Sequence, residues 1–440
     1  MVEVENKTQR YDSYKNSGVE WLGEIPEHWE IKPGFTILSE SKTKNIGFLE
    51  KTVLSLSYGN VVIKPEEKLT GLVPESFETY QIVQPGDIII RPTDLQNDKT
   101  SLRTGLAKDN GIITSAYINL RVSKAYDNNF YHYYLHTIDI NKVIYGLGSG
   151  LRQNISFDDF KRFPFPLPPL QEQTAIAQFL DDKTTKIDHA VSVKEKQIEL
   201  LKERKQILIH KAVTRGLDDT VKLKDSGVEW IGEIPEHWEV KKLKELCKAY
   251  GRIGFRGYTT SDLVNEGEGA ITISPSNIKD EFMTFEKCSY LSWKKYEESP
   301  EIQIFNNDVL VVKTGSTFGK IGIVKDLPLK ATINPQLLVL KDISISPDYF
   351  YSALKTSMIQ IQIQKEVIGS TIPTISETKI LNFKIALPPQ IQIEKTVVYL
   401  NNLNEKFKTA ISLKQQEIEK LKEYKSSLIN SVVTGKVKMC

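Results

Sequence analysis

The stretch SGVEWLGEIPEHWE occupies residues 17–30, and SGVEWIGEIPEHWE occupies residues 226–239. The two copies differ only at Leu22 and Ile231. An internal repeat decides the architecture of a chain before any local pattern does, because each copy is expected to build the same unit. The chain is therefore expected to build one structural frame twice.

Each copy of this stretch is too apolar for a free loop. Its anchors surround a turn at Pro26 and are Trp21, Leu22, Ile25 and Trp29. We interpret each copy as a packing clip that seats a globular block against another element. His28 and His237 lie inside the clips and share no carboxylate or cysteine pattern, so they are interpreted as clip residues.

A second repeat lies downstream of each clip. LPPLQEQTAIAQFLDDKTTKIDHAVSVKEKQIELLKERKQILIHKAVTRG fills 167–216, and LPPQIQIEKTVVYLNNLNEKFKTAISLKQQEIEKLKEYKSSLINSVVTGK fills 387–436. The blocks between clip and LPP, about 31–166 and 240–386, share layout more than residues. The repeated segments stay constant while the blocks between them differ. This pattern indicates one scaffold that presents two different surfaces.

Both downstream copies predict long helices with a narrow apolar stripe, which is the seam of a coiled coil rather than the wide face of a core helix. About 45 residues would span about 65 Å. Neither helix could bury its stripe alone, and the path of the chain favours an antiparallel pair. Lys194 and Lys414 interrupt the seam and are expected to reach past it to water. The seam residues are Leu180, Ile187, Val191, Ile198, Leu201, Leu208, Leu400, Phe407, Ile411, Ile418, Leu421 and Leu428.

The fold class predicted is α+β, with two globular α/β domains separated by two long antiparallel coiled-coil helices in a pseudo-two-fold internal repeat. Short β-rich runs broken by Gly, Pro, Asn and Asp fill the blocks, and NNFYHYYLHTI and SPDYFYSALKTSMIQIQIQ read as helices. The predicted divisions are a first globular domain with its clip at 1–166, a long helix at 167–216, a linker, clip and second domain at 217–386, and a long helix and tail at 387–440.

Composition bounds the class of protein. The 440 residues carry a formal net charge of +2 and 40% hydrophobic residues, as in a soluble globular protein of two or three domains. The sequence contains no run of about 18 apolar residues, so no membrane span is predicted. The polar N-terminus does not resemble a signal peptide. Cys247, Cys288 and Cys440 are too far apart for a disulfide framework or metal spacing, so a reducing cytoplasm is expected.

No active site is predicted. KTGSTFGKIG at 313–322 lacks the first glycine and the final Ser or Thr of a phosphate loop, so nucleotide binding is not favoured. PLPPL and ALPPQ lack the polar residue of the methyltransferase motif that they superficially share. His132 and His136 stand four apart on a predicted helix without the glutamate of a zinc protease, so a packed or surface pair is favoured over a metal site. No catalytic residue and no metal site is assigned.

Polar loops between short strands are where a rigid scaffold places recognition residues. Arg suits guanine and Asn or Gln suits adenine at base edges, while Lys, Ser and Thr suit phosphates. Ordinary solvated loops remain the alternative for each segment alone, and recurrence in both blocks favours DNA. The candidate DNA-binding residues are Arg91, Thr93, Gln96, Asn97, Lys99, Arg103, Arg152, Gln153, Asn154, Arg252, Arg256, Tyr258, Lys313, Thr314, Ser316, Thr317, Lys320 and Thr371.

The ordered set of clips, LPP helices and dissimilar blocks, with GDIII at 86–90 and GSTIPTIS at 369–376, resembles the DNA-specificity subunit of a type I restriction–modification system. The resemblance covers nearly the whole chain. It departs at LPPQIQIE, which stands for LPPLQEQ, and at GSGLRQNIS, which the first block has in place of GSTIPTIS.

This resemblance implies two target-recognition domains, each reading one half of a bipartite site on double-stranded DNA. The helices would set the spacer and dock two modification subunits, which would carry S-adenosylmethionine and methylate adenine. Restriction subunits would add ATP- and magnesium-dependent translocation and cleavage. The chain itself would be non-catalytic, would bind no cofactor and would not contact a membrane.

Two recognition domains on one duplex must contact grooves on the same side of the DNA. The half-sites are therefore expected about one helical turn, or about 34 Å, apart. Unlike blocks predict unlike half-sites, and four residues inserted into Leu180–Leu208 should change the spacer alone. Two alternatives remain open: a coiled-coil adaptor whose blocks bind protein, which would show no sequence-selective DNA binding, and a free-standing DNA-binding regulator, which would bind tightly without methyltransferase partners.

Overall fold

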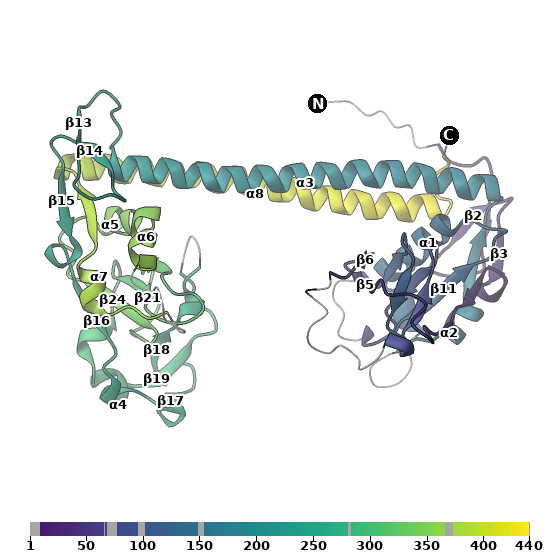
Figure 1. Cartoon of the computed structure of the whole chain (residues 1–440), viewed down its shortest axis with the longest axis horizontal. Coiled ribbons are helices and arrows are strands. Elements are labelled where there is room, and N and C mark those ends of the chain that lie inside the picture. Colours follow the sequence, from purple (N-terminus) through teal and green to yellow (C-terminus); the bar gives the residue numbers. More distant parts are fainter. Residues whose placement is uncertain are drawn as a thin grey trace. The chain divides into compact units, whose positions relative to one another are not determined.

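The structure is a computed structural model that describes residues 9–65, 67, 77–95, 102–147, 154–279, 283–365 and 373–439. The chain divides into two compact units, shown in Figure 1. Unit 1 comprises Met1–Glu195 and Gln415–Cys440, and unit 2 comprises Lys196–Lys414. Each unit therefore contains one globular block and one half of each long helix.

In unit 1 a four-stranded antiparallel sheet has the order β4-β11-β8-β9, and β10 pairs with β7 beside it. The pairs β1–β2, β3–β12 and β5–β6 are antiparallel ribbons. The elements that begin in this unit are β1 (Tyr14–Asn16), β2 (Glu24–Pro26), β3 (Glu30–Pro33), β4 (Leu38–Glu40), β5 (Leu54–Ser57), β6 (Asn60–Ile63), β7 (Gln81–Val83), β8 (Ile88–Ile90), β9 (Thr104–Leu106), β10 (Gly111–Ile113), β11 (Ile118–Val122), α1 (Asn128–Ile140), α2 (Phe157–Lys161), β12 (Pro164–Leu167) and α3 (Leu170–Thr214).

Unit 2 repeats this layout with unlike residues. Its first sheet has the order β16-β24-β21-β22, and a five-stranded sheet has the order β17-β19-β18-β23-β20. The elements are β13 (Leu223–Asp225), β14 (Glu233–Pro235), β15 (Glu239–Lys242), β16 (Lys248–Gly251), β17 (Leu263–Val264), β18 (Gly269–Ile273), β19 (Ser289–Ser292), α4 (Trp293–Glu297), β20 (Gln303–Ile304), β21 (Val309–Val312), β22 (Ile321–Ile323), β23 (Ala331–Ile333), β24 (Leu337–Lys341), α5 (Pro347–Leu354), α6 (Ser357–Lys365), α7 (Glu377–Leu381), β25 (Lys384–Leu387) and α8 (Gln390–Val433).

The internal repeat predicted from the sequence is confirmed at the level of strand pairing. Ribbon β1–β2 matches β13–β14, and the ribbon that closes each block, β3–β12, matches β15–β25. Each four-stranded sheet also begins at the second strand after the clip, β4 or β16, and ends with an antiparallel pair of consecutive strands, β8–β9 or β21–β22. The α+β fold class with two globular domains and two long helices is therefore the observed one.

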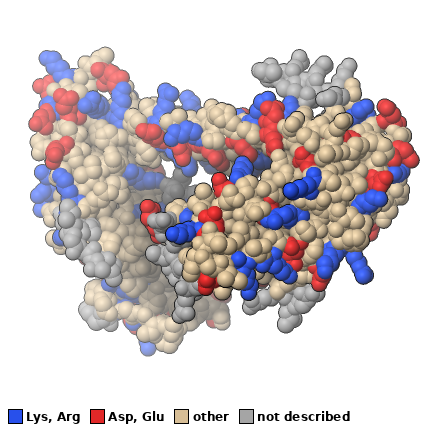
Figure 2. Space-filling view, turned by 45° about the vertical axis from the view of Figure 1, so that its right-hand side comes forward, with Lys and Arg blue, Asp and Glu red and all other residues tan. Residues whose placement is uncertain are grey.

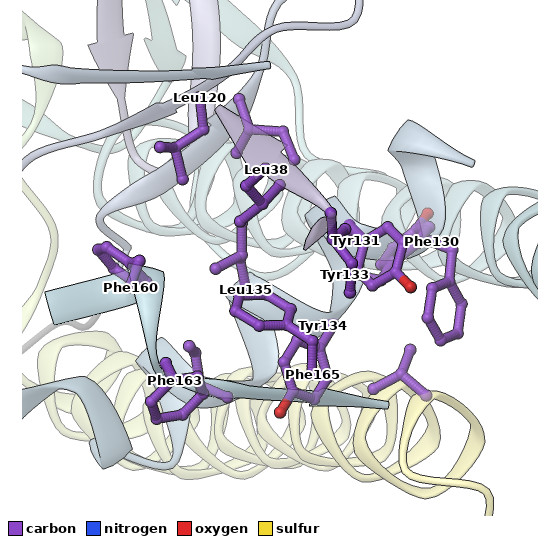
Figure 3. Close-up of a cluster of buried hydrophobic side chains, with 14 of the residues drawn as sticks. Leu38, Leu120, Phe130, Tyr131, Tyr133, Tyr134, Leu135, Phe160, Phe163 and Phe165 are labelled. Carbon is purple, nitrogen blue, oxygen red and sulfur yellow. The ribbon is translucent and has the colours of Figure 1, made fainter. Parts of the chain in front are cut away.

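The core of unit 1 lies between the four-stranded sheet, α1 and the long helices. Helix α1 contributes four large aromatic side chains, in two adjacent pairs, and Asp127 caps its start by accepting a hydrogen bond from the Phe130 N–H. Figure 3 shows the rings of Tyr134, Phe163 and Phe165 gathered below Leu135. The Tyr134 and Phe165 ring centroids are 5.1 Å apart, a separation at which aromatic pairs attract beyond the area that they bury.

The first clip is a packing element, as predicted. Leu22, Ile25 and Trp29 are fully buried in the core of unit 1, together with residues of α1, α3 and the end of α8. Trp29 also packs on Gly435, where a side chain would collide with Pro26 and Trp29. Each buried aliphatic side chain of this kind stabilises a fold by about 1.5–3 kcal/mol, so the clip fastens the globular block to the helix pair.

In unit 1 the two long helices lie side by side in opposite directions. Asp188 of α3 accepts from Lys425 of α8 at 2.7 Å, and farther along α3 Lys194 forms an ion pair with Glu417. In unit 2, α3 residues Ile209 to Val213 share a core with Ile393 to Leu403 of α8. The antiparallel coiled coil predicted from the sequence is confirmed within each unit.

All predicted seam residues are buried or half-buried, which confirms the narrow apolar stripe. The buried ones are Leu180, Ile187, Val191, Leu400 and Ile418, and the half-buried ones are Ile198, Leu201, Leu208, Phe407, Ile411, Leu421 and Leu428. The prediction for Lys194 was wrong: its ammonium group pairs with Glu417 instead of ending in water.

The segment SPDYFYSALKTSMIQIQIQ does not form one helix, as its pattern had suggested. It forms α5 and α6, which are interrupted at Lys355 and Thr356. The Thr356 hydroxyl donates to the Ala353 carbonyl at 2.7 Å, and a hydroxyl bonded to nearby backbone competes with the helical hydrogen bonds. A tight turn therefore replaces continuous helix.

Candidate nucleic-acid interface

In unit 1 the structure joins two of the loops that were predicted to bind DNA. The loop after β8 runs through Arg91 and Thr93, and the Ile155 N–H donates to the Pro92 carbonyl at 3.0 Å. The side-chain oxygen of Asn154 accepts from the Asp94 N–H at 3.1 Å. Arg91 is half-buried and Thr93 is exposed. These contacts hold Asn154 beside the loop, so both segments present one surface.

Unit 2 contains the same joint with different side chains. The Ile375 N–H donates to the Lys313 carbonyl at 3.0 Å, and the hydroxyl oxygens of Thr314 and Thr374 lie 3.0 Å apart. A short helix follows the joint in both units: Ser156 caps α2 and Ser376 caps α7. The loop after the third strand of the sheet and the segment before a short helix therefore form a common feature, which we call the loop joint.

The second loop joint continues into an ordered turn. Gly315 and Gly319 have φ angles of 103° and 79°, which disfavour residues with a Cβ atom. The Val312 N–H donates to the Lys320 carbonyl at 2.8 Å and closes the turn. Ser316 and Thr317 at its tip are exposed, while Lys320 is half-buried. The turn therefore presents two hydroxyl groups from a fixed backbone.

A third predicted segment reaches the same place in unit 2. A Cβ atom on Gly251 at the end of β16 would lie 3.1 Å from Lys313 Nζ and 2.7 Å from Glu377 Oε1. The ends of these two side chains therefore lie directly beside the strand. A pocket there is lined by Lys313, Thr374, Ser376 and Lys379 among others. Thr374, Ser376 and Lys379 were missed from the sequence, although they flank Thr371.

Arg103 is a correction to the predicted set. It is 1% exposed, and its guanidinium donates to the carbonyls of Arg91, Thr93 and Asp94 at 3.2, 2.6 and 2.9 Å. The Arg103 N–H also donates to Asp139 at 2.7 Å. A guanidinium committed to three carbonyls cannot read a base edge. Arg103 therefore holds the backbone of the first loop in its conformation.

Arg252 is corrected in the same way. It is 6% exposed and donates to the Ile333 carbonyl at 3.1 Å, to the Thr332 hydroxyl at 3.0 Å and to the Arg256 carbonyl at 3.3 Å. Its guanidinium lies 5.1 Å from the centre of the Tyr258 ring, and burial raises the pKa of Tyr258 above its usual value. Arg252 and Tyr258 therefore pack against each other and hold the two ends of the 250–258 segment together.

Arg256 belongs to the surface of this segment, where it forms an ion pair with Glu301 at 3.3 Å. Six predicted residues lie outside the described residues, and their predictions stay untested: Gln96, Asn97, Lys99, Arg152, Gln153 and Thr371. Of the remaining candidates, the structure brings Arg91, Thr93 and Asn154 together in unit 1 and Lys313, Thr314, Ser316 and Thr317 together in unit 2.

His132 and His136 are half-buried on α1, and one ring nitrogen of each is shielded from solvent. Burial lowers the pKa of His132 to about 3 and that of His136 to about 4. Among the residues described, no group of three His, Cys, Asp or Glu side chains is placed to hold a metal ion. Within the same ranges no helix is long and apolar enough to cross a bilayer.

Figure 2 shows basic and acidic side chains interspersed over the visible face, in keeping with the net charge of +2. Neither sign dominates this face. Recognition of a polyanion would therefore depend on local groups such as Lys313 and Lys379, rather than on a field from the whole surface.

The family model described as "Type I restriction modification DNA specificity domain" matches residues 30–200 and 235–423. The chain is 27% identical over 335 residues to the type I restriction enzyme MjaVIII specificity subunit of Methanocaldococcus jannaschii, covering 75% of each protein. It is 25% identical over 325 residues to the EcoBI specificity subunit of Escherichia coli, covering 68% of this chain and 64% of that protein.

A solved structure described as "Structural basis underlying complex assembly and conformational transition of the type I R-M system" superposes with a TM-score of 0.69 at 14% identity. The match covers 93% of this chain and 98% of that one, and it supports the fold. Together with the repeated blocks and loop joints, the family match leads to one conclusion. The chain belongs to the type I restriction–modification DNA specificity family.

Proposed function

We propose that this chain is the DNA-recognition subunit of a type I restriction–modification complex, in which each unit reads one half of a bipartite, asymmetric site. The observation that carries the proposal is the loop joint, which recurs in both units on the same strand order but with unlike side chains. A conserved frame beneath different exposed groups is what two readers of different sequences require.

The groups at the two joints differ in what they can recognise. Unit 1 offers Arg91, Thr93 and Asn154, and Arg or Asn side chains form hydrogen bonds to purine edges in the major groove. Unit 2 offers Lys313, Thr314, Ser316 and Thr317, which suit phosphate oxygens and set the register of the domain on the duplex. The first joint therefore carries base-reading chemistry, and the second carries at least the positioning contacts of its half-site.

The buried arginines give both readers a rigid base. Arg103 donates hydrogen bonds to the carbonyls of the first loop. Arg252 connects the 250–258 segment to β23 by hydrogen bonds to Thr332 and Ile333. When hydrogen bonds from a buried side chain already hold a loop in place, its recognition groups lose less conformational entropy on binding. Both arginines are assigned here as positioning residues rather than DNA contacts.

The helix pair is proposed to set the spacer and to dock two modification subunits. On the unit 2 part of α3, Leu200 and Ile207 are 52% and 59% exposed and stand one heptad apart, outside the seam. Exposed apolar residues at heptad spacing on a helix suit a second helix of a partner protein. Methylation with S-adenosylmethionine, and ATP- and magnesium-dependent cleavage by restriction subunits, would belong to those partners in the cytoplasm.

The test is methylome sequencing of cells that express the chain with its modification subunit. The proposal predicts one bipartite motif with two unlike halves, and replacement of 31–166 by the block of a relative should change one half only. An adaptor without DNA specificity would leave the methylated motif unchanged. A free-standing regulator is not favoured, because the family match covers both blocks and most of both helices.

A further inference from the structure

A half-buried tyrosine fills a slot beside the first clip. The Tyr11 hydroxyl donates to the Glu172 carboxylate, and its ring lies 6.1 Å from that of Trp29 and 5.7 Å from that of His28. His28 Nε2 lies 2.8 Å from the other oxygen of Glu172. Tyr11 thus occupies the space between the clip and the first turn of α3.

The same slot is built in unit 2 around the second clip. Trp238 and His237 stand where Trp29 and His28 stand, and Gln392 takes the place of Glu172 near the start of α8. The Trp238 indole N–H donates to Gln392 Oε1 at 2.8 Å, and the Gln392 amide donates to His237 Nε2 at 2.9 Å. Two of the four groups that form the slot are therefore repeated, and Gln392 replaces the third, Glu172.

The position in unit 2 that corresponds to Tyr11 holds a different residue. The registers of β1–β2 and β13–β14 match, since Tyr14 pairs with Pro26 and Leu223 pairs with Pro235. The Glu27 N–H donates to the Ser13 carbonyl, and the Glu236 N–H donates to the Lys222 carbonyl. Counting back through this shared register places Thr220 at the position of Tyr11.

Thr220 does not fill the slot. Its backbone N–H and hydroxyl both donate to Asp218, at 2.9 and 2.6 Å, and the residue is exposed. A pocket of about 200 Å³ opens instead, lined by Arg215, Val221, His237, Trp238, Gln392 and Lys395 among others. An apolar cavity of about 150 Å³ is large enough for a benzene ring.

We propose that this pocket binds a tyrosine side chain supplied by another subunit of the restriction–modification complex, in the pose that Tyr11 takes in unit 1. The ring would pack edge-on against Trp238, as Tyr11 does against Trp29, and its hydroxyl would donate to the Gln392 side-chain oxygen. Arg215 and Lys395 outnumber Asp218, the one carboxylate in the lining, so the pocket favours a tyrosine flanked by acidic residues. The partner's identity rests on the proposed function, whereas the pocket's chemistry rests on the internal repeat alone.

The repeat supplies its own variants for the test. N-acetyl-tyrosinamide is titrated into the full chain by calorimetry, with N-acetyl-alaninamide as the ring-free control. The wild type should bind one tyrosinamide with a dissociation constant on the order of 1 mM, as expected for a ligand of this size. Thr220→Tyr should plug the pocket and weaken binding at least tenfold, while Thr220→Ser should bind as the wild type does.

A second variant works in the opposite direction. Tyr11→Thr should open the slot in unit 1 and add a second tyrosinamide site, provided that circular dichroism shows a native fold. No saturable binding to the wild type, or binding unaffected by Thr220→Tyr, would overturn the proposal. Either result leaves DNA reading by the loop joints untouched.

The source of the tyrosine is tested by assembly. Thr220→Tyr should weaken association of the chain with its modification subunit at least tenfold, and Thr220→Ser should not. Unchanged assembly of Thr220→Tyr would overturn the assignment of the tyrosine to that complex. Because Thr220 lies outside both loop joints, a change of the methylated half-sites in this variant would count against the proposed function instead.

Discussion

Thr314 and Thr374 lie sixty positions apart in sequence, and their hydroxyl oxygens lie 3.0 Å apart. This contact unites two segments that the sequence offers only as separate candidates. It sits beside the hydrogen bond from the Ile375 N–H to the Lys313 carbonyl, so the two segments lie side by side. The corresponding contact in unit 1 joins Asp94 to Asn154.

Lys313→Ala is expected to lower the affinity for a duplex that carries the full site by about tenfold, or about 1.4 kcal/mol, because one ammonium contact to a phosphate is lost. The slope of log affinity against log salt should fall by about 1. Fluorescence anisotropy across a salt series measures both. Lys294→Ala on α4 is the control, since this exposed lysine lies outside the joint. An unchanged salt slope in Lys313→Ala would remove this residue from the interface.

Arg103→Ala is expected to lower the free energy of unfolding by about 3 kcal/mol, because it removes a buried side chain together with its hydrogen bonds to three carbonyls. The first loop should lose its shape, so discrimination at the first half-site should weaken while the second half-site is read as before. Urea denaturation and competition with half-site mutant duplexes measure the two effects. The exposed Lys124→Ala is the stability control. A stable variant with normal discrimination would show that Arg103 does not position the loop.

Stability should fall in acid because of His132 and His136 on α1. Their pKa values are lowered to about 3 and about 4 in the folded state, against about 6.5 when unfolded. Below pH 6.5 the unfolded chain therefore binds protons that the folded chain does not, and the fold loses up to about 1.4 kcal/mol per pH unit for each histidine until about pH 4. The double variant His132→Gln, His136→Gln should show a shallower loss between pH 6.5 and 5. The exposed His189→Gln is the control, and equal slopes in both would contradict the assignment.

The exposed pair Leu200 and Ile207 should contribute to partner docking. Leu200→Glu with Ile207→Glu is expected to weaken binding of the modification subunit by at least tenfold while leaving helix content unchanged, because both side chains are outside the seam. Analytical ultracentrifugation and circular dichroism measure the two. Gln206→Glu adds a negative charge on another face of α3 and should have little effect. Normal assembly of the double variant would place the docking surface elsewhere.

The sequence predicted the frame because its signals are local and repeated. The clip anchors, the LPP segments and the heptad stripe each depend on spacing along the chain, and Leu22, Trp29 and Leu180 are buried as predicted. Segment 346–364 was the exception, because its apolar pattern continues across Thr356 while the backbone turns there.

The roles of charged loop residues could not be read in this way. Arg103 and Lys313 come from similar polar stretches, yet one is buried under carbonyls and the other borders a pocket. That difference depends on contacts with residues far along the chain, such as Asp139 for Arg103. The signal that could have found the unit 2 pocket was present: Tyr11 and Glu172 are replaced by Thr220 and Gln392 in otherwise matched repeats.

The central claim is that the helix pair sets the distance between two independent half-sites. One heptad inserted into α3 beside Lys194 and one into α8 beside Glu417 would preserve the seam and lengthen the pair by about 10 Å. Methylome sequencing should then show both half-sites unchanged and a spacer longer by about 3 base pairs, at about 3.4 Å each. Methylation of the original motif with its original spacer would contradict the account.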